Sequence, residues 1–517
     1  MDEEQIRQRR RRSRARSRRR RQEEKRRRVL LLVLAVLAAI LLAAAGAVAG
    51  GRKSVREEAG SIRPELLPGD DTGIGLGGKP EEAEAAENSR ENGESDQKGS
   101  QEEAQKETLK EEQKETQKEA MEKGDSEAEK MAAELLSSMT LEEKIFQLFM
   151  VTPEALTGYD EVYMAGEATK DAIWERPVGG IVYFSQNLKD KDQTREMLAK
   201  TARYGEERSG LPPFLAVDEE GGQVARISGK EGFSLEAFPD MSKIGASNDE
   251  AKAFEVGETI GKYLADLGFD VDFAPVADVL TNQDNTVVAR RSFGSDAEIV
   301  SRMVSEEVKG LKKHGVSPVL KHFPGHGGTA EDSHETKPVL HRTLEELSET
   351  EFLPFAAGIE SGADFVMAGH IGVPEIEEDG RPAVFSKTLL TDVLRKQLGF
   401  EGIIITDAMN MGAVTESYDS GEAAVAALSA GADMILMPED FDAAVQAVKD
   451  AVEKGALTES RIEESAMRIL ALKAEKNMER ETARKKPGCF KMNFFWLSWG
   501  RKISVILSGM RTVSSPF

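Results

Sequence analysis

Cysteine is nearly absent, since Cys489 is the only one among 517 residues. No disulfide can therefore form within one copy of the chain, and no zinc site built from several cysteines is possible. Phosphate-binding glycine motifs of the forms GxGxxG and GxxxxGK[ST] do not follow the first apolar run of the globular part, which argues against a nucleotide-binding fold. The net charge of -23 is spread unevenly, because arginine dominates residues 1–28 and glutamate is abundant in residues 51–131.

A long uncharged segment follows the basic residues 1–28. Residues 29–50 read VLLLVLAVLAAILLAAAGAVAG, and about 22 helical residues are enough to cross the ~30 Å hydrocarbon core of a membrane. The basic flank predicts that residues 1–28 stay in the cytoplasm and that the following chain lies outside. We therefore expect a single-pass anchor in the cell membrane with an extracytoplasmic catalytic domain. The alternative is a signal peptide cleaved near residue 49, which would release a secreted protein.

Two further segments lack the pattern of a packed core. Residues 51–131 contain few aromatic or β-branched side chains and many Glu and Lys, so they cannot bury enough apolar surface to offset the entropy of ordering. We expect a disordered acidic linker that holds a domain away from the membrane. Residues 481–517 carry two of the three tryptophans but show no repeat or helical period. This atypical tail is either a peripheral membrane-binding piece or a divergent terminus.

Globular patterning covers residues 132–480. Thr140 and Glu143 predict a helix capping box ahead of apolar residues at helical spacing, namely Ile145, Leu148 and Phe149. Apolar runs beginning at 179, 213, 269, 317, 364, 402 and 432 then alternate with amphipathic stretches. This alternation predicts an α/β fold of parallel strands joined by helices. Seven such runs favour a (β/α)8 TIM-type barrel with one hidden strand over an open doubly wound sheet, and the helix over 460–476 should pack outside it.

Polar residues directly follow several of the apolar runs. They are Asp218, Lys321, His322, His370 and Asp407. The active site of such a barrel lies at the C-terminal ends of its strands, where these residues stand. An unpaired buried charge is costly, so each residue is explained either by an ion pair inside the barrel mouth or by a functional role. Their recurrence at one topological place favours the functional role.

All six histidines lie between His314 and His370. A metal centre or a general acid/base could use such a cluster. In the stretch KHFPGHGGTAEDSHE, Asp332 and His334 are two positions apart, so in an extended loop the carboxylate can fix the tautomer of the imidazole. We favour the acid/base over a metal-dependent hydrolase, because most of the histidines share one loop. Insensitivity to chelators would separate the two.

Several motifs occur in a fixed order: MTLEEKIFQLF, VDEEGGQVARI, RRSFGSD, KHFPGHG followed by DSH, GADFVMAGHI and ITDAMNMGA. Together they resemble the family 3 glycoside hydrolases. KHFPGHG with DSH more narrowly resembles the β-N-acetylglucosaminidase, NagZ-type, branch of that family. The resemblance covers about residues 134–478.

The resemblance implies a set of roles. Asp407 would be the nucleophile of a retaining double displacement, and His334, oriented by Asp332, would be the acid/base. This departs from the usual pair of carboxylates in retaining glycosidases. Sugar binding is implied for five further residues, which are Asp218, Arg226, Arg291, Lys321 and His322.

The expected function is therefore a retaining exo-β-N-acetylglucosaminidase. It would act on peptidoglycan-derived fragments, with chito-oligosaccharides as the other substrate class, and water or phosphate could resolve the intermediate. We expect no metal, no cofactor, no nucleic-acid partner and a monomeric state. A catalytically silent wall-binding protein is the remaining alternative, and it is disfavoured because Asp332, His334 and Asp407 are all present.

Overall fold

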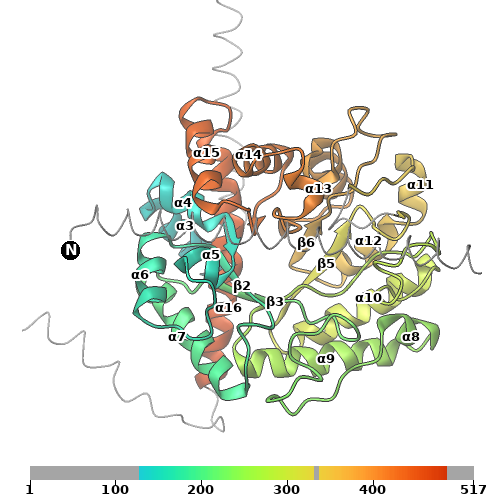
Figure 1. The fold of residues 1–517 in the computed structure, drawn as a ribbon, viewed down its shortest axis with the longest axis horizontal. Helices are drawn as coiled ribbons and strands as arrows, with labels where there is room; N and C mark the ends of the chain where they lie inside the picture. Colours follow the sequence, from blue (N-terminus) through green and yellow to red (C-terminus); the bar gives the residue numbers. More distant parts are fainter. Residues whose placement is uncertain (1–126, 331–336, 486–517) are drawn as a thin grey trace, which may run out of the picture. The chain divides into compact units, whose positions relative to one another are not determined.

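The computed structural model describes residues 127–330 and 337–485, with side chains described as far as 480 (Figure 1). The predicted membrane segment, residues 51–126 of the acidic linker and residues 486–517 of the C-terminal tail lie outside these residues. Asp332 and His334 also lie outside them. Residues 127–131, predicted as the end of the disordered linker, instead begin a helix over Glu127–Ser138, because Ala128 and Ala132 are buried in an apolar cluster with Leu470 and Ala474. In the part of the chain that is described, no helix combines the length and the apolar character that a membrane span requires.

Eight short parallel strands form the centre of the domain. They are β1 (Phe149–Val151), β2 (Gly180–Tyr183), β3 (Phe214–Val217), β4 (Val271–Asp272), β5 (Ser317–Phe323), β6 (Phe365–Ala368), β7 (Ile403–Thr406) and β8 (Ile435–Leu436). Their order is β7-β6-β5-β4-β3-β2-β1-β8. The ends approach each other through a parallel bridge between Ile405 and Met434, and the Thr406 N–H donates to the Met434 carbonyl at 3.0 Å. The sheet is therefore a nearly closed barrel of the predicted TIM type.

Helices surround the barrel (Figure 1). They are α3 (Glu127–Ser138), α4 (Leu141–Gln147), α5 (Pro153–Thr157), α6 (Glu167–Glu175), α7 (Lys191–Ser209), α8 (Met241–Ala246), α9 (Glu250–Leu267), α10 (Ala297–Lys312), α11 (Leu344–Glu349), α12 (Phe352–Glu360), α13 (Gly412–Thr415), α14 (Ser420–Ala430), α15 (Phe441–Glu453) and α16 (Glu459–Lys485), with a 3-10 helix η1 (Ala383–Phe385) and a π-helix η2 (Thr388–Gln397). Because helices cover them, the strands are buried along their whole length, which explains their continuous apolar runs.

The hidden strand is β1, and its position corrects one expectation. The predicted capping box is present, since the Thr140 N–H donates to Glu143 Oε2 at 2.9 Å and the Glu143 N–H donates to Thr140 Oγ1 at 3.3 Å. Helix α4 ends at Gln147, however, so the assignment of Phe149 to the helix was wrong. Phe149 is the first residue of β1. A three-residue strand directly after a helix continues the same apolar run, and periodicity cannot separate the two.

Helix α16 begins where the sequence predicts and extends to Lys485. Ile462, Ile469 and Leu470 are buried, as expected for a helix that packs on the barrel. Met467 and Leu472 are only partly buried. Part of α16 therefore presents apolar side chains outside the main core.

Candidate active site

The Lys321 ammonium lies at the centre of a charged network at the C-terminal ends of β3 and β5. Its Nζ is 3.0 Å from Asp218 Oδ1 and 2.5 Å from Glu220 Oε1. The side chains of Lys321 and Glu220 are each 2% exposed, whereas that of Asp218 is 18% exposed. Glu220 therefore holds Lys321 in place, and Asp218 is the more exposed of the two carboxylates that bind it.

Arg291 also binds the Glu220 carboxylate. The guanidinium forms a bidentate pair with this carboxylate, with Nε to Oε2 at 2.8 Å and Nη2 to Oε1 at 2.6 Å. Burial alone would raise the pKa of Glu220, but the positive charges of Arg291 and Lys321 hold that pKa well below its usual range. A permanently ionised Glu220 thus balances two buried cations and fixes their positions.

Arg226 borders the network from the loop after β3. Its Nη2 is 3.6 Å from Asp218 Oδ2, and its guanidinium lies over the Phe184 ring at 5.7 Å from the centroid. The backbone N–H of Arg226 donates to the buried carboxylate of Glu219. This carboxylate also accepts from two further backbone N–H groups and from the Tyr263 hydroxyl. The loop that carries Arg226 is therefore tied firmly to the barrel.

His322 is oriented by Asp278, which the sequence analysis did not single out. Asp278 Oδ2 is 2.8 Å from His322 Nδ1, and Asp278 Oδ1 accepts the backbone N–H groups of His322 and His326 at 3.1 Å and 2.7 Å. His322 Nε2 lies 3.4 Å from Arg291 Nη2. Since arginine can only donate, Nε2 accepts and the proton resides on Nδ1, facing Asp278. These contacts fix which nitrogen of His322 carries the proton when the ring is neutral.

Asp407 stands directly after β7 at the same end of the barrel. Its backbone N–H donates to the Ala368 carbonyl at 2.8 Å, and its Oδ1 accepts the Ala408 N–H at 2.7 Å. Burial would raise the pKa of Asp407, but the charges of His370, His322 and Lys321 together with the hydrogen bond from the Ala408 N–H hold that pKa below its ordinary value. Asp407 is therefore a carboxylate at neutral pH, as a nucleophile requires.

The structure thus brings all five predicted binding residues into one connected network, at the barrel end that also carries Asp407. Glu220 and Asp278 are additions to that set. Asp332 and His334 lie outside the described residues, so their roles stay predictions. The chain leading towards them is anchored, because the Asn285 side-chain amide donates to the His326 carbonyl at 2.8 Å and the Thr329 hydroxyl lies 2.9 Å from His326 Nδ1.

A network of charged side chains beside the ionised Asp407 carboxylate, at the mouth of a parallel barrel, is suited to binding a sugar and attacking it. Residues 140–472 match the model of the glycosyl hydrolase family 3 N-terminal domain. The chain belongs to glycoside hydrolase family 3. It is accordingly a glycoside hydrolase, as the order of its motifs predicts.

Individual relatives agree with this family. A β-hexosaminidase of Hydrogenovibrio crunogenus is 35% identical, and the match covers 57% of this chain and 81% of the relative. β-Hexosaminidase A of Pseudoalteromonas piscicida is 31% identical. The match covers 58% of this chain and 53% of the relative, so this chain spans only about half of that protein. Among solved structures, a family 3 β-N-acetylglucosaminidase from a Paenibacillus species is 34% identical with a TM-score of 0.62, covering 71% of this chain and 68% of that one.

Proposed function

We propose that this family 3 enzyme is a retaining exo-β-N-acetylglucosaminidase that uses Asp407 as nucleophile and His334 as acid/base. The observation that carries the proposal is the ionised Asp407 carboxylate at the barrel end that also holds Lys321, Arg291 and Asp218. Relatives named β-hexosaminidase and β-N-acetylglucosaminidase support the choice of sugar.

The reaction proceeds in two displacements. Asp407 attacks the anomeric carbon and forms a glycosyl ester, while His334 donates a proton to the departing oxygen. In the second step His334 accepts a proton from water, whose oxygen attacks the same carbon and releases Asp407. Asp332 orients the imidazole and stabilises its protonated form. The two inversions together retain the configuration of the sugar.

The charged network binds the terminal sugar. Asp218 is the more exposed carboxylate of the network and can accept hydrogen bonds from ring hydroxyls, while Lys321 and Arg291 donate from fixed positions. Glu220 keeps these two cations in place without facing the ligand itself. Such directional donors and acceptors, gathered around one sugar, suit removal of one terminal residue at a time.

The substrate follows from the proposed location. Residues 29–50 would anchor the chain in the cell membrane and place the catalytic domain outside, where peptidoglycan fragments are the available amino-sugar polymer; chito-oligosaccharides are the second candidate. After the acid/base has given up its proton, the group beside the leaving group would be a neutral imidazole rather than a carboxylate, with the negative charge of Asp332 further away, which favours anionic aglycones such as a lactyl-bearing sugar. Product analysis on muropeptides, with and without phosphate, separates these substrates and identifies the acceptor.

The stereochemical course tests the mechanism. We expect the full-length chain to hydrolyse a chromogenic β-N-acetylglucosaminide and to release the β-anomer first, as followed by NMR. Asp407→Asn should lose activity by several orders of magnitude. Asp392→Asn, which changes an exposed aspartate paired with Lys396 at 2.8 Å on η2, is the matched control and should keep activity. Release of the α-anomer first, or full activity of Asp407→Asn, would contradict the proposal.

A further inference from the structure

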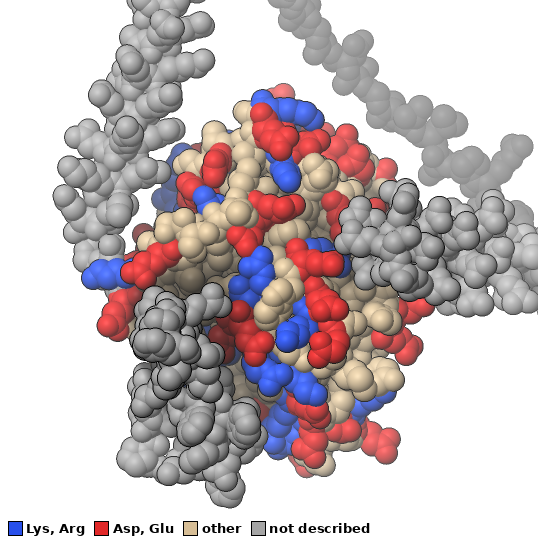
Figure 2. All heavy atoms as spheres, turned by 90° about the vertical axis from the view of Figure 1, so that its left-hand side faces the viewer, with Lys and Arg blue, Asp and Glu red and all other residues tan. Residues whose placement is uncertain are grey.

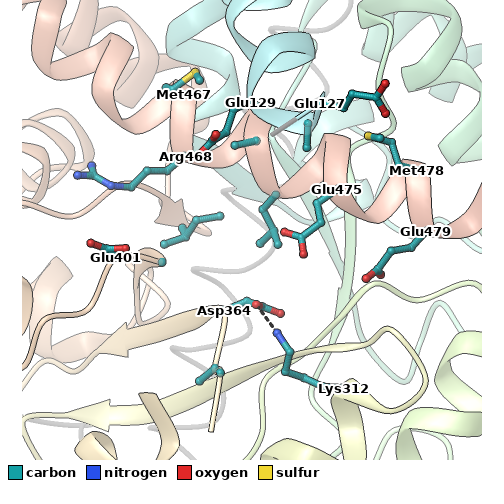
Figure 3. Close-up of a pocket in the computed structure, with 17 residues that line it drawn as sticks. Glu127, Glu129, Lys312, Asp364, Glu401, Met467, Arg468, Glu475, Met478 and Glu479 are labelled. Atoms are coloured by element: carbon teal, nitrogen blue, oxygen red, sulfur yellow. Dashed lines mark hydrogen bonds and ion pairs between the residues drawn. The ribbon is translucent and has the colours of Figure 1, made fainter. Parts of the chain in front are cut away.

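A groove of about 1090 Å³ lies at the end of the barrel opposite the active site (Figure 3). Asp364, one residue before β6, and Glu401, two residues before β7, border it, and so does Lys312 at the C-terminal end of α10. Helices α3 and α16 close its other side. Because the strands are parallel, residues preceding them lie at the N-terminal end of the barrel, whereas Asp407 lies at the C-terminal end. The groove is therefore separate from the sugar site.

The floor of the groove is apolar. Its apolar lining includes Ile403, Met467, Ala471, Leu472 and Met478. The four α16 side chains among them are only partly buried. Removing apolar surface from water is favourable, so an apolar segment that covers these side chains would gain binding energy.

The rim of the groove is acidic. Figure 3 shows Glu475 and Glu479 projecting from α16 towards the space that Asp364 and Lys312 border from the other side. Lys312 is already paired with Asp364 at 2.7 Å. Among the side chains that the structure describes, Glu401, Glu475 and Glu479 form no ion pair. The carboxylates of these three glutamates therefore give the rim negative charge that a cationic ligand could pair with.

Arg468, the other cationic side chain that lines the groove, also forms ion pairs with acidic residues. Its Nη1 is 3.2 Å from Asp433 Oδ1 and its Nη2 is 2.7 Å from Glu464 Oε1. Acidic and basic side chains are interspersed over the face shown in Figure 2. The groove instead combines an apolar floor with an excess of one sign of charge, which is the pattern of a binding surface for a basic, apolar segment.

The chain contains such a segment directly after α16. Residues 486–517 have no Asp or Glu, and their basic residues are Lys486, Lys491, Arg501, Lys502 and Arg511. The stretch 494–499 reads FFWLSW and lies between Lys491 and Arg501. We propose that residues 486–517 fold back into the groove, with the FFWLSW stretch on the apolar floor and the flanking bases against the rim glutamates.

The segment is long enough for this course. From Glu475 to Lys485 the helix rises by about 15 Å at 1.5 Å per residue. Residues 486–494 can span roughly 30 Å when extended, so the aromatic stretch reaches back to the middle of the groove. Pro487 and Gly488 stand just after the helix, and this pair of residue types ends helices and favours chain reversal.

Two other occupants are distinguishable from this one. Residues 1–28 are also basic but offer few apolar side chains to cover the floor. A second copy of the chain could insert its own C-terminal segment. The positive charge and the aromatic side chains of residues 486–517 together favour this segment over both alternatives.

Disulfide trapping tests the proposal in the full-length chain, purified in detergent. Because Cys489 is the only cysteine, Cys489→Ser gives a clean background for the pair Ser498→Cys and Glu401→Cys. The matched control pairs Ser498→Cys with Glu255→Cys, an exposed glutamate on α9 that does not line the groove. Oxidation with copper phenanthroline should link the groove pair within one chain at least tenfold faster than the control pair. Equal rates, or links formed only between chains, would overturn the proposal.

Two further measurements use the same background. Adding Glu475→Lys and Glu479→Lys should slow trapping of the groove pair several-fold, whereas Glu298→Lys, an exposed change on α10, should not. Ending the chain after Lys485 should increase binding of an apolar dye and leave glycosidase activity unchanged, because the groove is separate from the sugar site. If charge reversal leaves the trapping rate unchanged, or truncation leaves dye binding unchanged, residues 486–517 do not occupy the groove. If dye binding increases only after residues 1–28 are also removed, those residues occupy the groove instead.

Discussion

Replacing Glu307 with glutamine should change how stability depends on pH. Glu307 lies on α10, is 1% exposed, and neither of its carboxyl oxygens has a hydrogen-bond partner in the described part of the chain. Burial and the nearby negative charge of Glu220 raise its pKa to about 8, although Lys321 opposes them. The ordinary value is 4.5. The pKa of Glu307 is higher in the folded state than in the unfolded state. Its contribution to the free energy of unfolding is therefore fully present below pH 4.5 and is lost as the pH rises through 8.

The size of the effect follows from these two values. One pKa unit corresponds to about 1.4 kcal/mol, so full ionisation of Glu307 costs the folded state on the order of 5 kcal/mol. Between pH 5 and pH 8 the part lost is roughly 3 kcal/mol. Glu307→Gln cannot ionise and should lack this loss. Its stability relative to the natural chain should therefore rise by that amount across the interval, whatever the offset at pH 5.

Urea unfolding of the full-length chain at pH 5, 6, 7 and 8, followed by circular dichroism, measures this difference. Glu306→Gln is the matched control, because Glu306 is the preceding residue and pairs with Lys309 at 2.6 Å on the partly exposed side of α10. Its stability should run parallel to that of the natural chain. Parallel curves for Glu307→Gln as well, or a relative stability that falls with pH, would show that Glu307 does not ionise within this interval at the expense of folding.

Three other changes have defined outcomes. Asp278→Asn removes the charged hydrogen bond that orients His322 and should lower kcat/KM by roughly 10- to 100-fold, since such bonds are worth about 1.5–3 kcal/mol; an unchanged kcat/KM would dismiss this role. His370→Ala removes the positive neighbour that lowers the pKa of Asp407, so the acid limb of the pH–rate profile should move to higher pH rather than stay in place. Thr140→Ala removes the α4 cap and should destabilise the domain by about 1 kcal/mol in urea unfolding, with activity unchanged.

Most of the fold could be predicted because a strand buried on both faces appears as a continuous apolar run. The runs at 402 and 364 correspond directly to β7 and β6. The run at 269 is longer than its strand, since β4 ends at Asp272 and Pro275, which has no N–H to donate, interrupts the regular ladder. Strand β1 escaped prediction because three residues are too few to show a pattern of their own.

The site was partly predictable for a similar reason. Asp218, Lys321 and His322 follow or end apolar runs, so their position at the barrel mouth could be inferred from the strands. Glu220 and Asp278 position other charged or ionisable side chains, and no spacing pattern in the sequence indicates this role. Their partners come from β5 and the loop before α10, and only the folded barrel brings these together.

In the proposed mechanism, the Asp407 carboxylate forms a bond with the anomeric carbon of an N-acetylglucosaminyl group. The most direct measurement treats the full-length chain with a 5-fluoro-N-acetylglucosaminyl fluoride, which slows breakdown of the glycosyl ester, and maps the adduct by mass spectrometry of the digested protein. We predict one sugar on the peptide that contains Asp407 and none on the same peptide of Asp407→Asn. A sugar attached to a different side chain, in a chain that remains active, would contradict the account.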